Sequence, residues 1–439
     1  PSGAISQPRG LCTATLMATL GGDSPQQLLT VNYYDREERL IKSVVGNLLQ
    51  GDYTVESSYS PYGLLTAQRD AFTLNRNIGT EWSHSHSYSY DRFGRTLDVM
   101  LDFSGRSIRT LGCEYDNLGR LSRTWGYNDD LSCSIAYNIN GTATHRSTPF
   151  VTEDLWFGYG KVPQYSGKIS GKDIYYGGNK QSYSYTYDKL GRLTGADYSE
   201  RENPAADYSA SYSYDLEANP TRIKRMGLTD VGTYGVVNEI RADYRNGRPR
   251  SVVDAADAPI LEGSLTGPGL QVKVTHEYDA NGNLVKDATR GIDSIRYNVL
   301  NLPERIYFSN GYRLDYIYHA DGVKLRETRR RPTFSIGAGS AGVITETTDY
   351  IGAYELEGGI PRRLNLPGGY MTIADTVYHH YIPDYQGNIL SVVNTRTRQV
   401  EQRTDYYPYG MQSAIAAILR CRCRIRCRWC RCKERRYRC

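Results

Sequence analysis

One short phrase recurs along this chain of 439 residues and constrains its fold more than any other feature. A Tyr-Asp or Tyr-Asn pair is followed by a few turn-forming residues, usually including Gly, and then in the clearest copies by Arg-Leu. Copies begin at Tyr34, Tyr90, Tyr115, Tyr187, Tyr214 and Tyr278, and looser copies begin at Tyr297 and at Tyr318, where His319 takes the second position. Tyr90 and Tyr115 lie 25 residues apart, and Tyr297 and Tyr318 lie 21 apart. This period predicts a repeat architecture in which each unit packs on its neighbours.

Each copy predicts a β-hairpin. Residues 181–187 alternate tyrosine with small hydroxyl residues, which is the two-residue period of a strand. The Asp or Asn that follows can bond the backbone two residues on, and Gly accepts a positive φ. The residues that carry this signature most clearly are Tyr34, Asp35, Tyr90, Asp91, Gly94, Tyr115, Asp116, Gly119, Arg120, Tyr187, Asp188, Gly191, Arg192, Tyr278, Asp279 and Gly282.

The aromatic composition also favours strands. The chain has 39 Tyr against 7 Phe and 4 Trp, and tyrosine can bury its ring while its hydroxyl stays wet. We therefore predict an all-β fold of repeated β-hairpins that stack or pair side by side. Residues 40–50 are the one short stretch before residue 411 where we expect a helix.

Changes of composition predict the domain layout. Residues 1–30 form a partial N-terminal segment, and residues 31–328 hold the repeats, with an insertion near 251–269. An Arg- and Gly-rich loop spans 329–342, a distinct β-segment spans 343–410, and an aberrant tail spans 411–439. Because Pro1 is not a Met, we expect the chain to be part of a longer protein.

The tail differs from everything before it. Its last 20 residues carry a net charge of +9 and six of the nine Cys, so the remainder of the chain has a net charge of −4 against +5 for the whole. A zinc site or a nucleic-acid-binding arm is conceivable from the Arg-Cys alternation, but translation in a shifted frame explains it better. The chain without its last 20 residues is mildly acidic and has no stripe of basic residues, so we expect no nucleic-acid partner. No run reaches the roughly 18 apolar residues of a membrane span.

No motif names a catalytic, metal or cofactor site. Residues 337–342 fit G-x-G-x-x-G, but a strand-like segment follows where a dinucleotide site needs a helix, so we predict a flexible loop. His84 and His86, and the pair His379 and His380, lack a clear third ligand, and we expect solvated imidazoles. Asn140 fits a glycosylation acceptor and also a turn. Each repeat Asp has a turn role, so we predict no enzyme activity and no cofactor.

The recurring phrase resembles the YD repeats of bacterial RHS proteins and, more distantly, of teneurins. The resemblance covers roughly residues 30–410. Residues 378–389 and 405–410 strengthen it, because they are similar to the RHS repeat-associated core through Asp384, Gly387, Asn388, Pro408 and Gly410. The resemblance implies that the repeated hairpins form a spiralling, hollow β-sheet shell, incomplete in this chain, that encloses a C-terminal toxin. It also implies a protein that is secreted or displayed on the cell surface.

Three functions stay open at this point. The chain is a structural shell that encloses or presents a C-terminal effector, or a module that binds carbohydrate or another cell surface. Alternatively, it is the scaffold of an enzyme toxin whose catalytic part lies downstream. The resemblance also implies an Asp-Pro-x-Gly self-cleavage segment beyond this point in the family, but the match stops at Gly410, so we assign no residue a catalytic role.

Overall fold

The computed structural model describes residues 4, 10–75, 78–230, 232–256, 274–333 and 342–413. Its 32 strands are antiparallel wherever their register is resolved, and two short 3-10 turns are the remaining regular elements of those residues. The predicted all-β class is therefore confirmed. Among the described residues, no helix is long and apolar enough to cross a membrane.

The chain divides into two compact units. The first holds residues 1–152, 243–252 and 273–379, and the second holds 153–242, 253–272 and 380–439. Four strands cross a boundary between these ranges: β12 (Thr152–Trp156), β18 (Thr233–Arg245), β19 (Arg248–Asp254) and β30 (Val377–Pro383).

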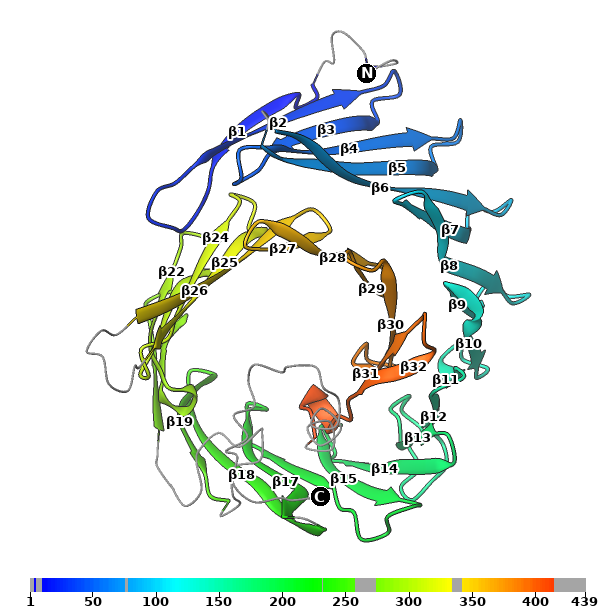
Figure 1. Ribbon diagram of the computed structural model, residues 1–439. Helices are drawn as coiled ribbons and strands as arrows, with labels where there is room; N and C mark the ends of the chain where they lie inside the picture. Colours follow the sequence, from blue (N-terminus) through cyan, green and yellow to red (C-terminus); the bar gives the residue numbers. More distant parts are fainter. Residues whose placement is uncertain are drawn as a thin grey trace, which may run out of the picture. The chain divides into compact units, whose positions relative to one another are not determined.

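The first unit begins with a run of strands that pair in chain order (Figure 1). They are β1 (Ala14–Ala18), β2 (Gln27–Tyr34), β3 (Leu40–Gly46), β4 (Asp52–Tyr59), β5 (Leu65–Asn75), β6 (Ile78–Tyr90), β7 (Thr96–Phe103), β8 (Arg106–Tyr115), β9 (Leu121–Gly126), β10 (Asn128–Tyr137) and β11 (Ala143–Ser147).

A second run in the same unit continues the pattern. It comprises β20 (Val274–Tyr278), β21 (Leu284–Asp287), η1 (Ala288–Arg290), β22 (Ile292–Tyr297), β23 (Pro303–Phe308), β24 (Arg313–Tyr318), β25 (Lys324–Thr333), β26 (Gly342–Ile351), β27 (Tyr354–Glu357), β28 (Ile360–Leu366) and β29 (Gly369–Thr372). The second unit holds β13 (Gly171–Tyr176), β14 (Asn179–Tyr187), β15 (Leu193–Glu200), β16 (Ala210–Tyr214), β17 (Pro220–Asp230), β31 (Ile389–Asn394), β32 (Gln399–Arg403) and η2 (Pro408–Gly410).

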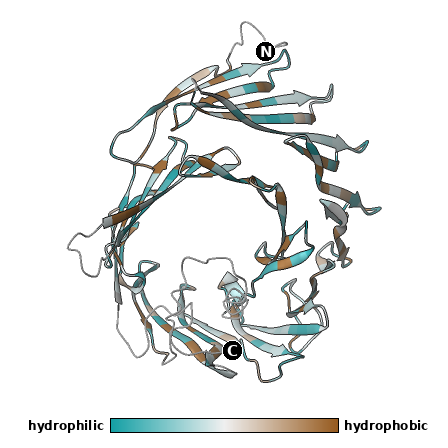
Figure 2. Cartoon of the chain, viewed as in Figure 1, coloured by the Kyte–Doolittle hydropathy of each residue, from teal (hydrophilic) through white to brown (hydrophobic). Residues whose placement is uncertain are grey.

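Each unit has its own apolar core. Figure 2 shows hydrophobic and hydrophilic residues alternating along many strands, as a two-residue period requires. In the first unit, buried side chains from β5 and β7 meet others from β26 to β29, among them Phe72, Leu101, Leu364 and Met371. The core of the second unit is built largely from tyrosine, including Tyr183, Tyr185, Tyr208, Tyr212 and Tyr407.

The repeat phrase forms the predicted hairpin turn. Asp91 Oδ1 accepts hydrogen bonds from the backbone N–H groups of Phe93 and Arg95, at 2.8 and 3.0 Å. Arg95 Nε donates to Asp91 Oδ2 at 2.6 Å. Gly94 has φ +79°, so a type I turn is followed by a left-handed residue, and Tyr90 pairs with Thr96 across a β-bulge. The residues of the phrase thus form the hairpin turn through contacts with one another.

The same turn recurs at the other copies with small substitutions. Asp35, Asp116 and Asp188 each accept the backbone and guanidinium bonds of an arginine four residues later. At Asp215, Asp279 and Asp384 an asparagine replaces that arginine and donates both bonds. Asn138 fills the Asp position itself and accepts from the N–H groups of Asn140 and Thr142. The turn interpretation of residues 140–142 is therefore confirmed.

Several local expectations were wrong. Residues 40–46 form β3 instead of a helix, because pairing with both β2 and β4 satisfies their backbone groups. Residues 329–333, expected in a loop, continue β25 and pair with β26. Met411 to Ser413, which we assigned to the tail, pack with the preceding segment: Met411 contacts the second core, and Ser413 N–H donates to the carbonyl of Asp405.

Other expectations fall on residues that the structure does not describe. Residues 257–269 of the predicted insertion and 414–439 of the tail lie outside the described ranges, as do 334–341 of the Gly-rich loop. Gly342 opens β26, so the strand expected after the G-x-G-x-x-G pattern is confirmed. The predicted domain boundaries remain predictions.

Candidate functional site

Each repeat tyrosine contacts the repeat before it. The hydroxyl of Tyr115 donates to the carbonyl of Thr96 at 2.9 Å, and Thr96 is the first residue of the returning strand in the preceding hairpin. The guanidinium of Arg95, from that same hairpin, lies 4.3 Å from the centre of the Tyr115 ring. We call this bond, from the tyrosine hydroxyl to a carbonyl of the preceding hairpin, the tyrosine clasp; in some copies an arginine guanidinium also covers the ring.

The clasp recurs through both units. The hydroxyl bonds measure 2.7 to 3.0 Å and join Tyr59 to Leu40, Tyr90 to Leu65, Tyr137 to Leu121, Tyr214 to Leu193, Tyr297 to Leu284 and Tyr318 to Pro303. An arginine of the earlier hairpin lies over the ring of Tyr59, Tyr137 and Tyr214 at 5.1, 4.6 and 4.9 Å. Phenylalanine supplies the ring but not the donor, which explains why tyrosine is so much commoner here.

The Tyr115→Phe substitution tests the clasp. It should lower the local unfolding free energy around β7 to β9 by about 1 kcal/mol, because one hydrogen bond is lost and the Thr96 carbonyl is left unpaired. Hydrogen exchange of peptides from these strands measures this energy. Tyr62→Phe is the control, since Tyr62 is 91% exposed; equal exchange in the two variants would contradict the clasp.

The turn carboxylates should make folding sensitive to acid. The backbone N–H and guanidinium of Arg192 lower the pKa of Asp188, and the Asn219 and Asn283 amides do the same for Asp215 and Asp279. A carboxyl whose pKa is lower in the folded state than its ordinary value of 3.8 stabilises the fold at pH values above 3.8. This contribution is lost as the pH falls through the lower pKa of the folded state.

We therefore expect stability to fall between pH 5 and about pH 2. Denaturant unfolding at several pH values measures this slope. Asp188→Asn is the matched variant, because Asn138 already serves the same turn in this chain. It should fold at neutral pH and show a shallower acid slope than the wild-type chain; an unchanged slope would contradict the linkage.

Residues of the repeats come together in the second unit with residues of the segment 343–410, which we call the core-like segment after its resemblance to the RHS repeat-associated core. They line a cavity of about 300 Å³, at the small end of the range of ligand pockets. Among the predicted residues, Tyr187, Gly191, Arg192, Asp384 and Pro408 line it. The other lining residues are Ile169, Lys172, Tyr185, Leu193, Tyr214, Ala218, Tyr385, Gln386, Tyr407 and Tyr409.

A buried charge pair and several phenols give this cavity its chemistry. Lys172 Nζ lies 3.9 Å from Asp384 Oδ2, and both side chains are almost fully buried. The Lys172 ammonium also lies 5.9 and 5.7 Å from the ring centres of Tyr183 and Tyr385. Burial raises the pKa of Tyr187 to about 12, so its hydroxyl remains protonated at physiological pH. The cavity thus offers aromatic faces and neutral hydroxyl groups beside one fixed ion pair.

Tyr407 and Tyr409 hold the segment 406–410 against the repeats. Tyr407 is 4% exposed, and its hydroxyl donates to the Met226 carbonyl at 2.5 Å. Tyr409 adopts φ +67° and shares a hydroxyl–hydroxyl bond of 2.9 Å with Tyr214. A Cβ on Gly410, at φ +78°, would lie 3.2 Å from Asn388 Oδ1. The Pro-Tyr-Gly sequence therefore serves a tight turn that packs next to the Asp384 hairpin.

The remaining signature residues do not join this cavity. Tyr34, Asp35, Tyr90, Asp91, Gly94, Tyr115, Asp116, Gly119, Arg120, Tyr278, Asp279 and Gly282 belong to hairpins of the first unit. Asp188, Gly387, Asn388 and Gly410 lie in turns of the second unit next to residues that line the cavity. Their roles, as the structure describes them, are in turns and clasps.

The expectation of solvated histidines was wrong. His84 and His86 are 4% and 8% exposed, and His379 is 8% exposed and stacks on Tyr370 with ring centres 4.5 Å apart. Burial lowers the pKa of His380 to about 4. Sequence reasoning also missed Lys172, because the Asp384 hairpin that contacts it lies far from it in the chain. No local pattern marks it as buried.

Comparison with known proteins gives distant likenesses. No protein-family model matches the chain, and no curated protein matches it. A crystal structure of TcdB2-TccC3-TEV is 13% identical, with 92% of this chain and 27% of that chain covered and a TM-score of 0.30. A structure of the Photorhabdus luminescens Tc holotoxin pore is 14% identical, with 88% and 28% covered and a TM-score of 0.27.

A porin-like protein from Bacteroides uniformis is also similar, at 9% identity with 79% and 97% covered and a TM-score of 0.17. This chain thus spans little more than a quarter of the length of the Tc structures. At these TM-scores the likenesses say nothing about function, which we argue from the chain's own contacts.

Proposed function

We propose that this chain is the structural repeat scaffold of an exported or surface-displayed protein of the RHS kind. The observation that carries the proposal is the tyrosine clasp, which repeats one contact between successive hairpins in both units. The repeat residues form turns and join neighbouring hairpins, and a chain in which they recur in this way favours a structural role, the extension of one β-sheet. The sequence resemblance to YD repeats supports the same function.

In this proposal the sheet encloses or presents an effector joined at its C-terminal side. The segment 406–413 supports it, because Tyr407 and Met411 anchor this side of the core-like segment in the core of the second unit. The chain itself is non-catalytic, since the turn and clasp roles account for its recurrent Asp, Arg and Tyr side chains. Any catalytic activity belongs to the effector.

A protection assay tests the enclosure. A flexible reporter peptide with a specific protease site is fused after Ser413, and its cleavage rate is compared with that of the same peptide fused to an unrelated globular protein. Slower cleavage by a factor of ten or more, restored when the scaffold is unfolded in urea, is the expected result. Equal rates, or solution scattering from a compact particle without an internal cavity, would contradict enclosure.

The cavity beside Lys172 favours a second candidate function, the binding of a carbohydrate. Its rings of Tyr187, Tyr214 and Tyr385 can stack on a sugar, while their hydroxyl groups and the Lys172–Asp384 pair can bond sugar hydroxyls. Glycan-array binding that Tyr385→Ala removes and Tyr62→Ala preserves would support it. No binding to any glycan at concentrations suited to millimolar affinities would exclude this function.

A further inference from the structure

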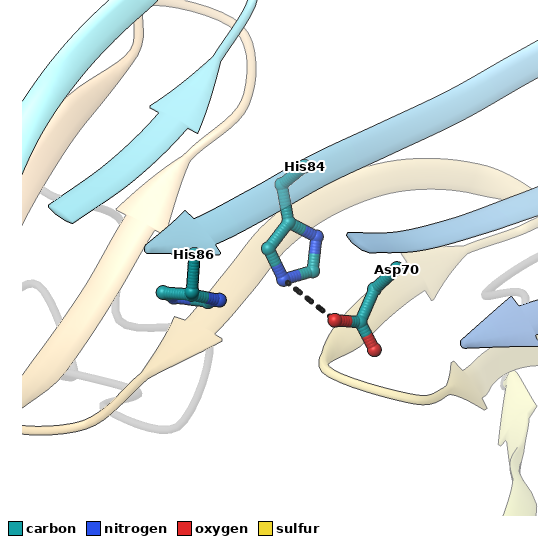
Figure 3. A group of neighbouring side chains, drawn as sticks. All are labelled: Asp70, His84 and His86. Carbon is teal, nitrogen blue, oxygen red and sulfur yellow. Dashed lines mark ion pairs between the residues drawn. The ribbon is translucent and has the colours of Figure 1, made fainter. Parts of the chain in front are cut away.

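Three side chains of the kinds that bind transition metals lie together on neighbouring strands of the first unit (Figure 3). Asp70 on β5 pairs directly with His84 on β6, and Gln68 pairs with His86. Side chains two residues apart on a strand point to the same face. The register therefore places both imidazoles on the same face as the Asp70 carboxylate.

The geometry of the three side chains suits a small metal ion. One donor atom from each residue lies within 4.8 Å of the other two, and His84 Nε2 is 3.8 Å from Asp70 Oδ2. Donors bound to tetrahedral zinc at 2.0–2.2 Å lie about 3.3 Å apart. Small rotations of the three side chains would close this difference without any change in strand register.

Outer groups already orient two of the three donors. The Tyr354 hydroxyl lies 2.9 Å from His84 Nδ1, which directs the other ring nitrogen toward Asp70. Tyr53 donates its hydroxyl to Asp70 Oδ1 at 2.5 Å, and Gln68 Nε2 donates to Oδ2 at 2.9 Å. Hydrogen-bonded partners of this kind fix ring orientation and ligand basicity in protein metal sites.

His86 supplies an independent indication of a ligand. Its side chain is more than nine-tenths buried, and within the described part of the chain its Nε2 has no hydrogen-bond partner. Leaving such an atom unpaired is energetically unfavourable, and a buried polar atom without a partner calls for an explanation.

We propose that Asp70, His84 and His86 bind one divalent transition-metal ion, with Zn²⁺ the best match. Two imidazoles and one carboxylate favour zinc over magnesium or calcium, which prefer all-oxygen sites. The three residues are buried, so the ion is structural. It joins β5 to β6 and, through His84 and Tyr354, connects both to β27 across the core of the first unit.

Metal titration of the full chain tests the site. The cysteines are first alkylated, because the C-terminal segment carries thiols that also bind zinc. The chain is then freed of metal with a chelator and titrated with Zn²⁺ alone and with Co²⁺ alone. We expect one ion per chain, and a tetrahedral Co²⁺ absorption spectrum. No binding at 1:1 stoichiometry would overturn the proposal.

Variants assign the ligands. His86→Gln and Asp70→Asn should weaken Zn²⁺ binding by more than the ~100-fold loss typical of outer-shell changes, and Tyr354→Phe by about 10- to 100-fold. His145→Gln, a histidine on β11, is the matched control and should bind normally. Unchanged affinity in a folded His86→Gln variant would refute the assignment. If that variant does not fold, zinc X-ray absorption of the wild-type chain decides, because imidazole scattering must be present.

Discussion

Replacing Tyr407 with alanine should release the segment 404–413 from the second unit and cost about 3–5 kcal/mol, the usual loss when a large buried aromatic side chain is truncated. Tyr407 packs against Tyr208, with ring centres 6.2 Å apart, and the Arg225 guanidinium lies 5.8 Å from the centre of its ring. Alanine would leave a cavity among tyrosines and remove the bond to the Met226 carbonyl. Tyr183 of the same core is held by a hydroxyl bond to the Tyr208 carbonyl at 3.3 Å, which limits its movement into the space.

Limited proteolysis and hydrogen exchange of residues 404–413 measure this release. Tyr407→Phe keeps the ring and loses only the hydroxyl, so its effect should be about 1–3 kcal/mol. Tyr165→Ala is the surface control in the same unit, because Tyr165 is 87% exposed. If Tyr407→Ala and Tyr165→Ala gave the same exchange in the segment 404–413, the anchoring of this segment would be disproved.

Leu364→Ala should destabilise the first unit by about 2–5 kcal/mol. Leu364 on β28 is 0% exposed and belongs to the same core cluster as Leu101 of β7, although the two lie far apart in the chain. Backbone hydrogen bonds join strands that are neighbours in the chain, whereas side chains such as Leu364 and Leu101 join the two strand runs. The cavity left by Leu364→Ala would therefore weaken the apolar contact between the two runs. The cooperativity of the unit depends on those contacts.

Trp82 reports this change, because it packs against the same cluster. Denaturant unfolding followed by tryptophan fluorescence should shift to a lower midpoint in Leu364→Ala. Ile360→Ala is the matched control on β28, since Ile360 is 55% exposed and surface substitutions usually change stability by less than about 0.5 kcal/mol. Equal midpoints for the two variants would show that the strand runs unfold independently.

The turns could be predicted from sequence because their chemistry is local. Asp91 and Arg95 are four residues apart, and the Asp side chain, a left-handed Gly and the returning strand together specify the hairpin. The helix expected over residues 40–50 was wrong, because local spacing alone did not decide the structure of these residues. Its apolar spacing suits either structure, and pairing with two flanking strands decided between them.

Features that depend on distant residues could not be predicted. His84 and His86 alternate with serines, a pattern typical of an exposed strand face, and Tyr354, 270 residues later in the chain than His84, contributes to their burial. The cavity beside Lys172 is assembled in the same way, from hairpins at opposite ends of the second unit's sequence. The excess of tyrosine over phenylalanine was interpreted as rings whose hydroxyl groups stay in water, whereas the repeat tyrosines donate those hydroxyl groups to carbonyls of the preceding hairpin.

The clasp has a direction, and this direction bears on how the chain is made. In every pair named above, the tyrosine hydroxyl reaches back to a carbonyl that was synthesised earlier. A ribosome or an export channel delivers the N-terminal hairpin first, so each later hairpin finds its acceptor already in place. Contacts of this kind close only short loops, which avoids the slow search of long-range strand pairing. The hairpins can therefore pair one after another from the N-terminus, as fast as the chain leaves the ribosome or the channel.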